Sequence, residues 1–216
     1  MKRRVVALLM ATMMGAFCIT GCGSSKEATS DKAAKTEKEA DTESDKDADK
    51  KAADKVAALI DAIYVQERND KTDEQCAEAK EAWDALTDAQ KELVEGENAD
   101  PDYFGRDTGD ASKDDARNQD DIGENEILAV SFGTSFNDSR VADIKGIEDA
   151  LQEANPDWSV RRAFTAQIII NHVQARDGEK IDNVDQALER AVDNGVKNLV
   201  CLLYTSPSPR DTERSR

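Results

Sequence analysis

The chain has 216 residues and a formal net charge of −17, from 46 Asp and Glu against 29 Lys and Arg. So acidic a chain offers no basic surface for the phosphates of a nucleic acid, which excludes that class of partner. The sequence also contains neither Gly-x-Gly-x-x-Gly nor Gly-x-x-x-x-Gly-Lys, so we expect no nucleotide cofactor.

Residues 1–22 have the features of an export signal. Lys2-Arg3-Arg4 precedes an apolar run, Val5 to Phe17, that is too short to span a bilayer. The run Ile19-Thr20-Gly21-Cys22 follows and resembles a bacterial lipobox, whose cysteine is acylated. We therefore expect an extracytoplasmic lipoprotein, anchored to the bacterial cell membrane through Cys22. An ordinary cleaved signal peptide and a short membrane anchor are the alternatives.

Two acidic segments flank a short helical one. Residues 23–54 contain no aliphatic side chain larger than Ala, which predicts a disordered acidic linker. Residues 55–95 repeat apolar side chains at helical spacing and predict a small helical module packed around Trp83. This module is similar to one that recurs in surface proteins of Gram-positive bacteria. Residues 96–125 cluster acids around glycines but do not match a calcium loop, so we expect a second acidic linker.

Residues 126–200 have the pattern of an α/β fold. Uncharged aliphatic runs predict strands buried on both faces, and apolar positions at helical spacing lie between those runs. Strands that alternate with helices predict a parallel sheet. The expected elements are, in order, a strand from Ile127, a helix over 141–154, a strand from Trp158, a helix from Ala166 to about Asp177, a helix over 184–192 and a strand over 196–200.

The same segment resembles a known family. The resemblance is carried by the runs ILAVSFGTSFNDSR, RRAFTAQIII and RDGEKIDNVDQALERAVDNGVKNLV. They look like the N-terminal part of the anaerobic cobalt chelatases, which insert cobalt into sirohydrochlorin. The resemblance implies a two-lobed α/β fold with the tetrapyrrole in the cleft between lobes. This chain would hold only the truncated start of that parallel three-layer sheet domain.

The candidate substrate site follows from the strand order. Ligands of open parallel sheets lie beyond the carboxyl ends of the strands. Amide and hydroxyl donors at a helix start, together with an arginine, suit the carboxylates of sirohydrochlorin, and an aromatic ring could lie against the macrocycle. Plain turns with packing aromatics are the alternative. The candidates are Ser131, Phe132, Gly133, Thr134, Ser135, Arg162 and Phe164.

The last residues, 201–216, differ in character from the rest. They resemble the translation of a sequencing adaptor, and we interpret them as an artefact rather than a variable C-terminus. The family's catalytic histidines and glutamate would lie downstream of Val200, so we expect no catalytic residue here and an inactive fragment. We interpret His172, the sole histidine, as a helix-surface residue. The four cysteines show no spacing typical of a metal site or of a disulfide framework.

Three functions are consistent with these observations. The first is a cobaltochelatase that inserts Co²⁺ into sirohydrochlorin or a related tetrapyrrole on the anaerobic path to cobalamin, with cobalt as substrate metal. The second is an extracytoplasmic lipoprotein that binds haem, another tetrapyrrole or cobalt. The third is a surface interaction lipoprotein in which the helical module matters most. The sequence leaves the oligomeric state open.

Overall fold

A parallel sheet organises the C-terminal half of the chain. The computed structural model describes residues 33–204, with side chains for residues 46–204. Its sheet has the order β2-β1-β3 and is formed by β1 (Asn125–Ser131), β2 (Ser159–Phe164) and β3 (Asn198–Leu203). Both neighbours pair with β1 in parallel, from Glu126↔Ser159 to Ser131↔Phe164 and from Asn125↔Asn198 to Val130↔Leu203. The predicted α/β class is confirmed.

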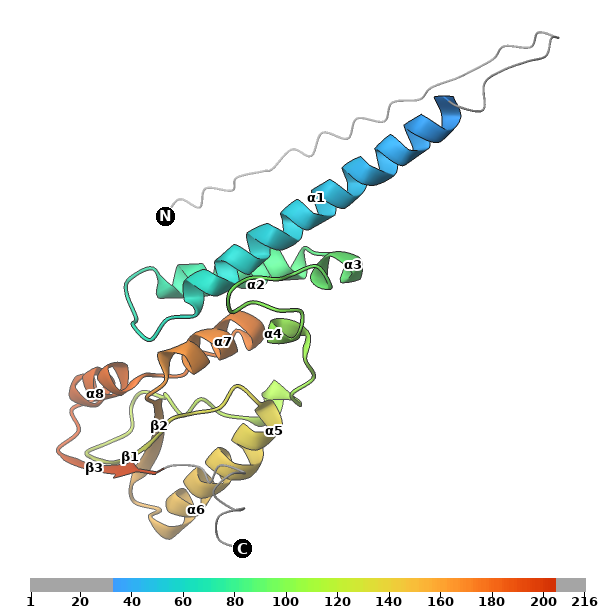
Figure 1. Ribbon diagram of the computed structural model, residues 1–216. Coiled ribbons are helices and arrows are strands. Elements are labelled where there is room, and N and C mark those ends of the chain that lie inside the picture. Colours follow the sequence, from blue (N-terminus) through green and yellow to red (C-terminus); the bar gives the residue numbers. More distant parts are fainter. Residues whose placement is uncertain (1–32, 205–216) are drawn as a thin grey trace, which may run out of the picture. The chain divides into compact units, whose positions relative to one another are not determined.

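Helices cover the sheet on both sides (Figure 1). The connection from β1 to β2 contains α5 (Asn137–Ser139), the π-helical segment η2 (Arg140–Lys145) and α6 (Gly146–Ala154). The connection from β2 to β3 contains α7 (Gln167–Asp177) and α8 (Val184–Asp193). The two connections run in opposite directions across the sheet, and right-handed crossovers therefore place their helices on opposite faces. The result is three layers.

Local signals explain where these helices begin and end. Asn183 caps α8, because its side chain accepts from the Gln186 amide while the Gln186 side chain accepts from the Asn183 amide. Gly178 ends α7 in the left-handed region at φ 74°. These positions agree with the break near Asp177 and the helix over 184–192 that the sequence predicts.

Strand β2 buries two adjacent arginines, one on each face of the sheet. Arg161 donates to Glu126 on β1 at 2.9 Å and to the Ala187 carbonyl of α8 at 2.7 Å. Arg162 donates from Nε and Nη2 to the two Glu148 carboxylate oxygens of α6, each at 2.8 Å. Both arginine side chains are 0% exposed. A buried guanidinium is stable only with such partners, so the pairs link β2 to helices on either side.

Asp114 completes the network around Arg162. Its oxygens accept from Arg162 at 2.7 and 2.9 Å and from Arg140 at 2.8 Å, and its side chain is 0% exposed. Burial by itself raises the pKa of Asp114, but the hydrogen bonds from Arg162 and Arg140 outweigh burial and lower it below its ordinary value. The carboxylate is therefore held in its charged form.

The acidic linker predicted over residues 96–125 is wrong, because this segment packs as part of the fold. It contains α4 (Asp102–Gly105) and the 3₁₀ turn η1 (Ala111–Lys113). Tyr103 and Phe104 are buried, and Phe104 meets Trp83 edge-on at 5.5 Å. Composition suggested a solvated segment, but a few aromatic side chains and one buried carboxylate are enough to order it.

The helical module is larger than predicted. It consists of α1 (Ala33–Ile63), α2 (Thr72–Asp84) and the short α3 (Asp88–Lys91). The disordered linker expected over residues 23–54 is thus helical from Ala33, and Ala53 is fully buried. Alanine, lysine and glutamate are strong helix formers, so the same composition that lacks a core still extends a helix. Trp83 is buried with Val56, Ile60 and Ile63 as expected.

Buried polar contacts attach this module to α7. The Asn171 side chain donates to the Ile63 carbonyl at 2.9 Å, and the Cys76 thiol contacts the Asn171 carbonyl at 3.6 Å. Gln174 donates to Asp73 at 2.8 Å. Asn171 is 0% exposed, so its side-chain amide is shielded from solvent at this contact. The module is therefore part of the same packed structure as the sheet.

Strand β3 extends further than predicted. It runs to Leu203, past the boundary at Val200, and all of its residues are exposed. Residues 1–32 and 205–216 lie outside the described part, and with them lie the export signal, Cys22 and most of the predicted artefact. None of the helices described between residues 33 and 204 is long and apolar enough to cross a membrane.

Replacing Asp114 with Asn tests the buried network. The variant leaves Arg162 and Arg140 without one of their carboxylate partners inside the fold, which lowers the free energy of unfolding by about 3 kcal/mol. Urea denaturation at pH 7 measures the loss. Asp110→Asn is the control, because Asp110 lies in the same segment with its side chain 51% exposed. Equal stability of the two variants would contradict the structural role of Asp114.

The same pair of proteins gives a pH test. The pKa of Asp114 is lower in the folded chain than in the unfolded chain, so its carboxylate stabilises the fold at neutral pH. This contribution disappears as the pH falls through the folded-state pKa. The stability difference between the parent chain and Asp114→Asn is therefore constant above pH 5 and shrinks below about pH 4. A difference that grows in acid would contradict the assignment.

Candidate functional site

The carboxyl ends of the strands converge at one edge of the sheet. Strand β1 leads there into a turn at Gly133, whose φ is +91°. A Cβ at this position would lie 2.4 Å from the ring of Phe164 at the end of β2. Glycine is therefore required at Gly133 both for its backbone conformation and for the close approach of Phe164. The turn predicted there is confirmed.

The aromatic candidates separate into one exposed ring and one buried ring. Phe132 follows β1 and is 59% exposed. Phe164 is 0% exposed and belongs to the cluster with Ile144, Ile170 and Val173. Phe132 is thus available to lie against a flat ligand, whereas the Phe164 ring mainly packs the core under Gly133.

Arg162 does not have the predicted role of contacting an anionic ligand. Burial by itself lowers its pKa, but the hydrogen bonds to Glu148 and Asp114 outweigh burial and raise it above the ordinary value. Its side chain is 0% exposed, so the guanidinium would have to leave both carboxylates to reach a ligand. Ser131 is 2% exposed, and its hydroxyl has no hydrogen-bond partner among the described residues. Both residues are internal.

The remaining candidates lie at the surface of the edge. Thr134 and Ser135 are half-buried. The Thr134 hydroxyl oxygen accepts from the Phe136 amide at 3.2 Å, which leaves its proton free to be donated. Helix α7 begins at the same edge with Ala166 as N-cap and has no side-chain cap. Its first amides are consequently available to an acceptor.

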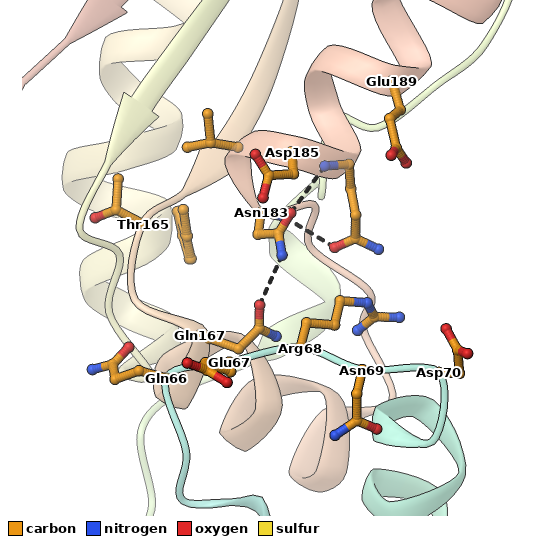
Figure 2. Close-up of a pocket in the computed structure, with 13 residues that line it drawn as sticks. Gln66, Glu67, Arg68, Asn69, Asp70, Thr165, Gln167, Asn183, Asp185 and Glu189 are labelled. Carbon is orange, nitrogen blue, oxygen red and sulfur yellow. Dashed lines mark hydrogen bonds between the residues drawn. The ribbon is translucent and has the colours of Figure 1, made fainter.

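A pocket of about 710 Å³ lies at the carboxyl end of β2. Its walls come from two parts of the chain: Phe164, Thr165, Gln167 and residues 183–186 with Glu189 on one side, and the loop residues Gln66 to Asp70 on the other. Figure 2 shows this loop along one side, with Asn183 and Asp185 opposite and Gln167 between them. Asn183 donates to Gln167 at 2.9 Å. The volume is in the range of small-molecule sites.

The pocket lining is polar and acidic. Its carboxylates are Glu67, Asp70, Asp185 and Glu189, and its cation is Arg68. Arg68 donates to Asp73 at 2.6 Å, so much of its charge is already compensated. The pocket therefore has an excess of negative charge. The sequence prediction missed this site, because residues 66–70 are nearly a hundred positions away from the strand end that they face.

His172 is not the surface residue that the sequence suggested. Its ring stacks on Tyr103 at 4.0 Å, and its Nε2 lies 2.5 Å from the Tyr103 carbonyl. Burial, followed by the nearby charge of Arg176, lowers the pKa of His172 to about 4. Among the described residues no group of three or more His, Cys, Asp or Glu side chains could hold a metal ion.

Replacing Gly133 with Ala tests the strand-end turn. The added methyl group must displace the Phe164 ring, and the alanine backbone must adopt a positive φ. We therefore expect a loss of about 3 kcal/mol in the free energy of unfolding. Gly123→Ala is the matched control, because Gly123 has φ +81° but nothing within 4 Å of the added Cβ. It should lose only about 1 kcal/mol. Thermal or urea unfolding measures both, and equal losses would show that Phe164 does not restrict this position.

The titration of His172 tests its burial. As the sole histidine of the chain, it gives a single pair of imidazole C–H resonances in the proton NMR spectrum. We expect a midpoint near pH 4, because burial disfavours the charged imidazolium. The folded state then binds fewer protons than the unfolded state between about pH 4 and 6.5, so stability falls as the pH falls through that window. A midpoint near 6.5 would mean that the ring is solvated.

Comparison with known proteins agrees with the geometry of the sheet. The sequence profile of the cobalt chelatase (CbiK) family matches residues 125–203, which include all three strands. The sirohydrochlorin cobaltochelatase of Salmonella typhimurium (strain LT2) is 38% identical over 73 residues, which are 34% of this chain and 28% of that enzyme. The chain thus spans little more than a quarter of that relative. No solved structure matches it. Residues 125–203 are thus similar to the cobalt chelatases (CbiK).

Proposed function

We propose that this protein binds a tetrapyrrole at the carboxyl edge of its sheet and takes part in inserting cobalt into it. The family match of residues 125–203 supports the reaction, and the similar Salmonella enzyme is named for sirohydrochlorin. Cobalt enters as substrate, and no nucleotide takes part. A single observation carries the proposal: the strands of the family-matched segment end together at one edge of the sheet. The exposed Phe132 ring and the start of α7, which has no side-chain cap, lie at that edge.

Each group at this edge has a defined part in binding. The exposed Phe132 offers an apolar face for the macrocycle. The first amides of α7 and the Thr134 hydroxyl supply hydrogen bonds to the carboxylates on its rim. Gly133 holds Phe132 and Thr134 on either side of a tight turn. The edge thus binds and orients the ring.

Insertion of Co²⁺ releases two protons from pyrrole nitrogens, and a base must accept them. His172 does not serve, because its half-buried ring stacks on Tyr103 and its Nε2 already contacts the Tyr103 carbonyl. We assign the bases to residues outside 125–203, in keeping with the small share of the Salmonella enzyme that this chain covers. The described segment supplies the platform for the macrocycle.

A second candidate is an extracytoplasmic tetrapyrrole-binding lipoprotein. The basic start, apolar run and Gly21-Cys22 favour it, because tetrapyrrole capture rather than synthesis suits a protein anchored outside the membrane. Lipid attachment at Cys22 and location at the outer face of the cytoplasmic membrane belong to both candidates. The two candidates differ in whether the protein catalyses the insertion of cobalt.

The proposal is tested by titrating the full chain with metal-free sirohydrochlorin under anaerobic conditions and following the absorption of the ring. We expect saturable binding that Phe132→Ser weakens about ten-fold through loss of the aromatic contact. Val192→Ser is the control, because Val192 is an exposed apolar side chain on α8, 78% exposed. Absence of binding by the parent chain would contradict the proposed function.

Adding Co²⁺ to the bound ring distinguishes the two candidates. A cobalt-dependent spectral change faster than in buffer alone indicates a chelatase. Binding of haem that is tighter than binding of sirohydrochlorin indicates a carrier.

A further inference from the structure

The turn after β1 carries two of the groups that the proposed function assigns to ring binding. Phe132 and Thr134 lie on either side of Gly133, and we call residues 131–137 the binding turn. A flexible turn loses conformational entropy when a ligand orders it, whereas a turn that is already fixed does not have this cost. The contacts that fix the binding turn therefore influence how tightly a ring binds.

Backbone amides after β2 fix the first half of the binding turn. The Ser131 carbonyl accepts from the Thr165 amide at 2.8 Å, and the Phe132 carbonyl accepts from the Ala166 amide at 3.3 Å. These bonds continue the pairing of β1 with β2 past the end of both strands. They set the direction of the chain at Phe132.

Two arginines fix the second half of the binding turn. Arg140 Nη1 donates to the Thr134 carbonyl at 3.4 Å, and Arg176 Nη2 donates to the Ser135 carbonyl at 2.7 Å. Arg176 Nη2 also lies 3.1 Å from Oδ1 of Asn137, which accepts from it. The contact of Arg176 with the Ser135 carbonyl is the shorter of the two carbonyl contacts, and a charged donor makes a stronger hydrogen bond than a neutral one. Arg176 is therefore the main support of this half.

Arg176 is itself held inside the protein. Its Nε and Nη2 donate to the two Asp177 carboxylate oxygens at 2.8 and 2.6 Å, and its side chain is 9% exposed. Asn137 is 3% exposed and donates to the Gly109 carbonyl at 3.1 Å. The planar guanidinium makes these bonds at fixed angles, so it holds the turn in one position.

We propose that Arg176 is the positioning residue of the ring site. By binding the Ser135 carbonyl and the Asn137 side chain, Arg176 fixes the binding turn. The Phe132 ring and the Thr134 hydroxyl then keep one orientation toward the tetrapyrrole. Because Nε and Nη2 of Arg176 are occupied within the protein, the residue acts through the turn. The inference rests on the proposed function, since it concerns how the same turn binds the same ligand.

A double-mutant cycle tests whether the ring contact of Phe132 depends on Arg176. The four full-length chains are the parent, Phe132→Ser, Arg176→Met and the double variant, because methionine keeps an unbranched side chain without a donor. Each is titrated with metal-free sirohydrochlorin, and the Kd is expressed per folded protein, with the folded fraction measured by circular dichroism.

The expected result is strong coupling between the two positions. Arg176→Met should weaken binding about five-fold, because the Phe132 ring is no longer held against the macrocycle. Phe132→Ser should then weaken binding only about two-fold in the Arg176→Met background, against about ten-fold in the parent. A purely structural role of Arg176 would leave the ten-fold effect unchanged.

Arg190→Met is the matched control. Arg190 Nε and Nη2 donate to the two Asp182 oxygens at 2.8 and 3.2 Å, as those of Arg176 do to Asp177. Each aspartate also has a second arginine nearby, at 3.9 Å for Asp182 and 3.8 Å for Asp177. Among the described residues, Arg190 has no hydrogen bond to the binding turn. This variant should bind sirohydrochlorin within about two-fold of the parent and keep the full effect of Phe132→Ser.

Three results would overturn the positioning role. They are additive effects of Arg176→Met and Phe132→Ser, binding by Arg176→Met equal to that of the parent, and loss of the Phe132 effect in Arg190→Met as well. In each case the proposed function stands, because the parent still binds the ring. If the parent does not bind sirohydrochlorin, the proposed function and this inference both fall.

Arg176→Lys replaces the methionine variant if that chain does not fold. Its ammonium keeps a charge beside Asp177 but cannot reproduce the planar fork that binds Asp177 and the turn together. The effect of Phe132→Ser should still fall, to about four-fold or less in this background. An unchanged ten-fold effect would refute the positioning role.

Discussion

The structure depends on the neutralisation of two guanidinium groups inside it. Arg161 and Arg162 are neighbours on β2, so the alternation of a strand sends their side chains to opposite faces of the sheet. Each buried guanidinium needs carboxylate partners, and these come from other elements. Arg161 pairs with Glu126 on β1, and Arg162 pairs with Glu148 on α6 and with Asp114. These pairs specify how the layers are stacked as much as the apolar contacts do, because a misplaced element would leave a charge unpaired in the core.

Much of the secondary structure could be predicted from local signals. Uncharged aliphatic runs marked the strands, Gly178 marked the end of α7, and Trp83 was recognised as the centre of the helical module. The acidic segments were harder, because composition describes an average side chain and the fold depends on single ones. Asp114 is separated from Arg162 by 48 positions, and no local pattern reveals that pairing. Likewise, the Lys, Glu and Ala of residues 33–54 lack a core of their own but extend α1 as a continuous helix.

The candidate site also has features that the sequence predicts and features that it does not. The turn chemistry of Gly133 could be predicted, since a tight strand-to-helix turn needs its backbone freedom. Which side chains of the strands face outward could not be predicted. The alternation of side chains along a strand assigns residues to the two faces of the sheet, but it does not tell which face a helix covers. Phe132 proved exposed, while Phe164 and Arg162 proved internal. The second wall of the pocket was also beyond prediction, since it comes from a loop that is held near the strand end by contacts of Ile63 with Asn171 and of Asp73 with Gln174.

The position of Asp114 also bears on where this domain begins. Sequence similarity places the start at residue 125, but the carboxylate that neutralises Arg140 and Arg162 lies upstream of that point. A recombinant fragment that begins at residue 125 would keep Arg140 and Arg162 but would lose Asp114, the carboxylate that pairs with both. The functional boundary for expression, and for any transplant of this fold into another protein, thus lies before Asp114 rather than at the first strand.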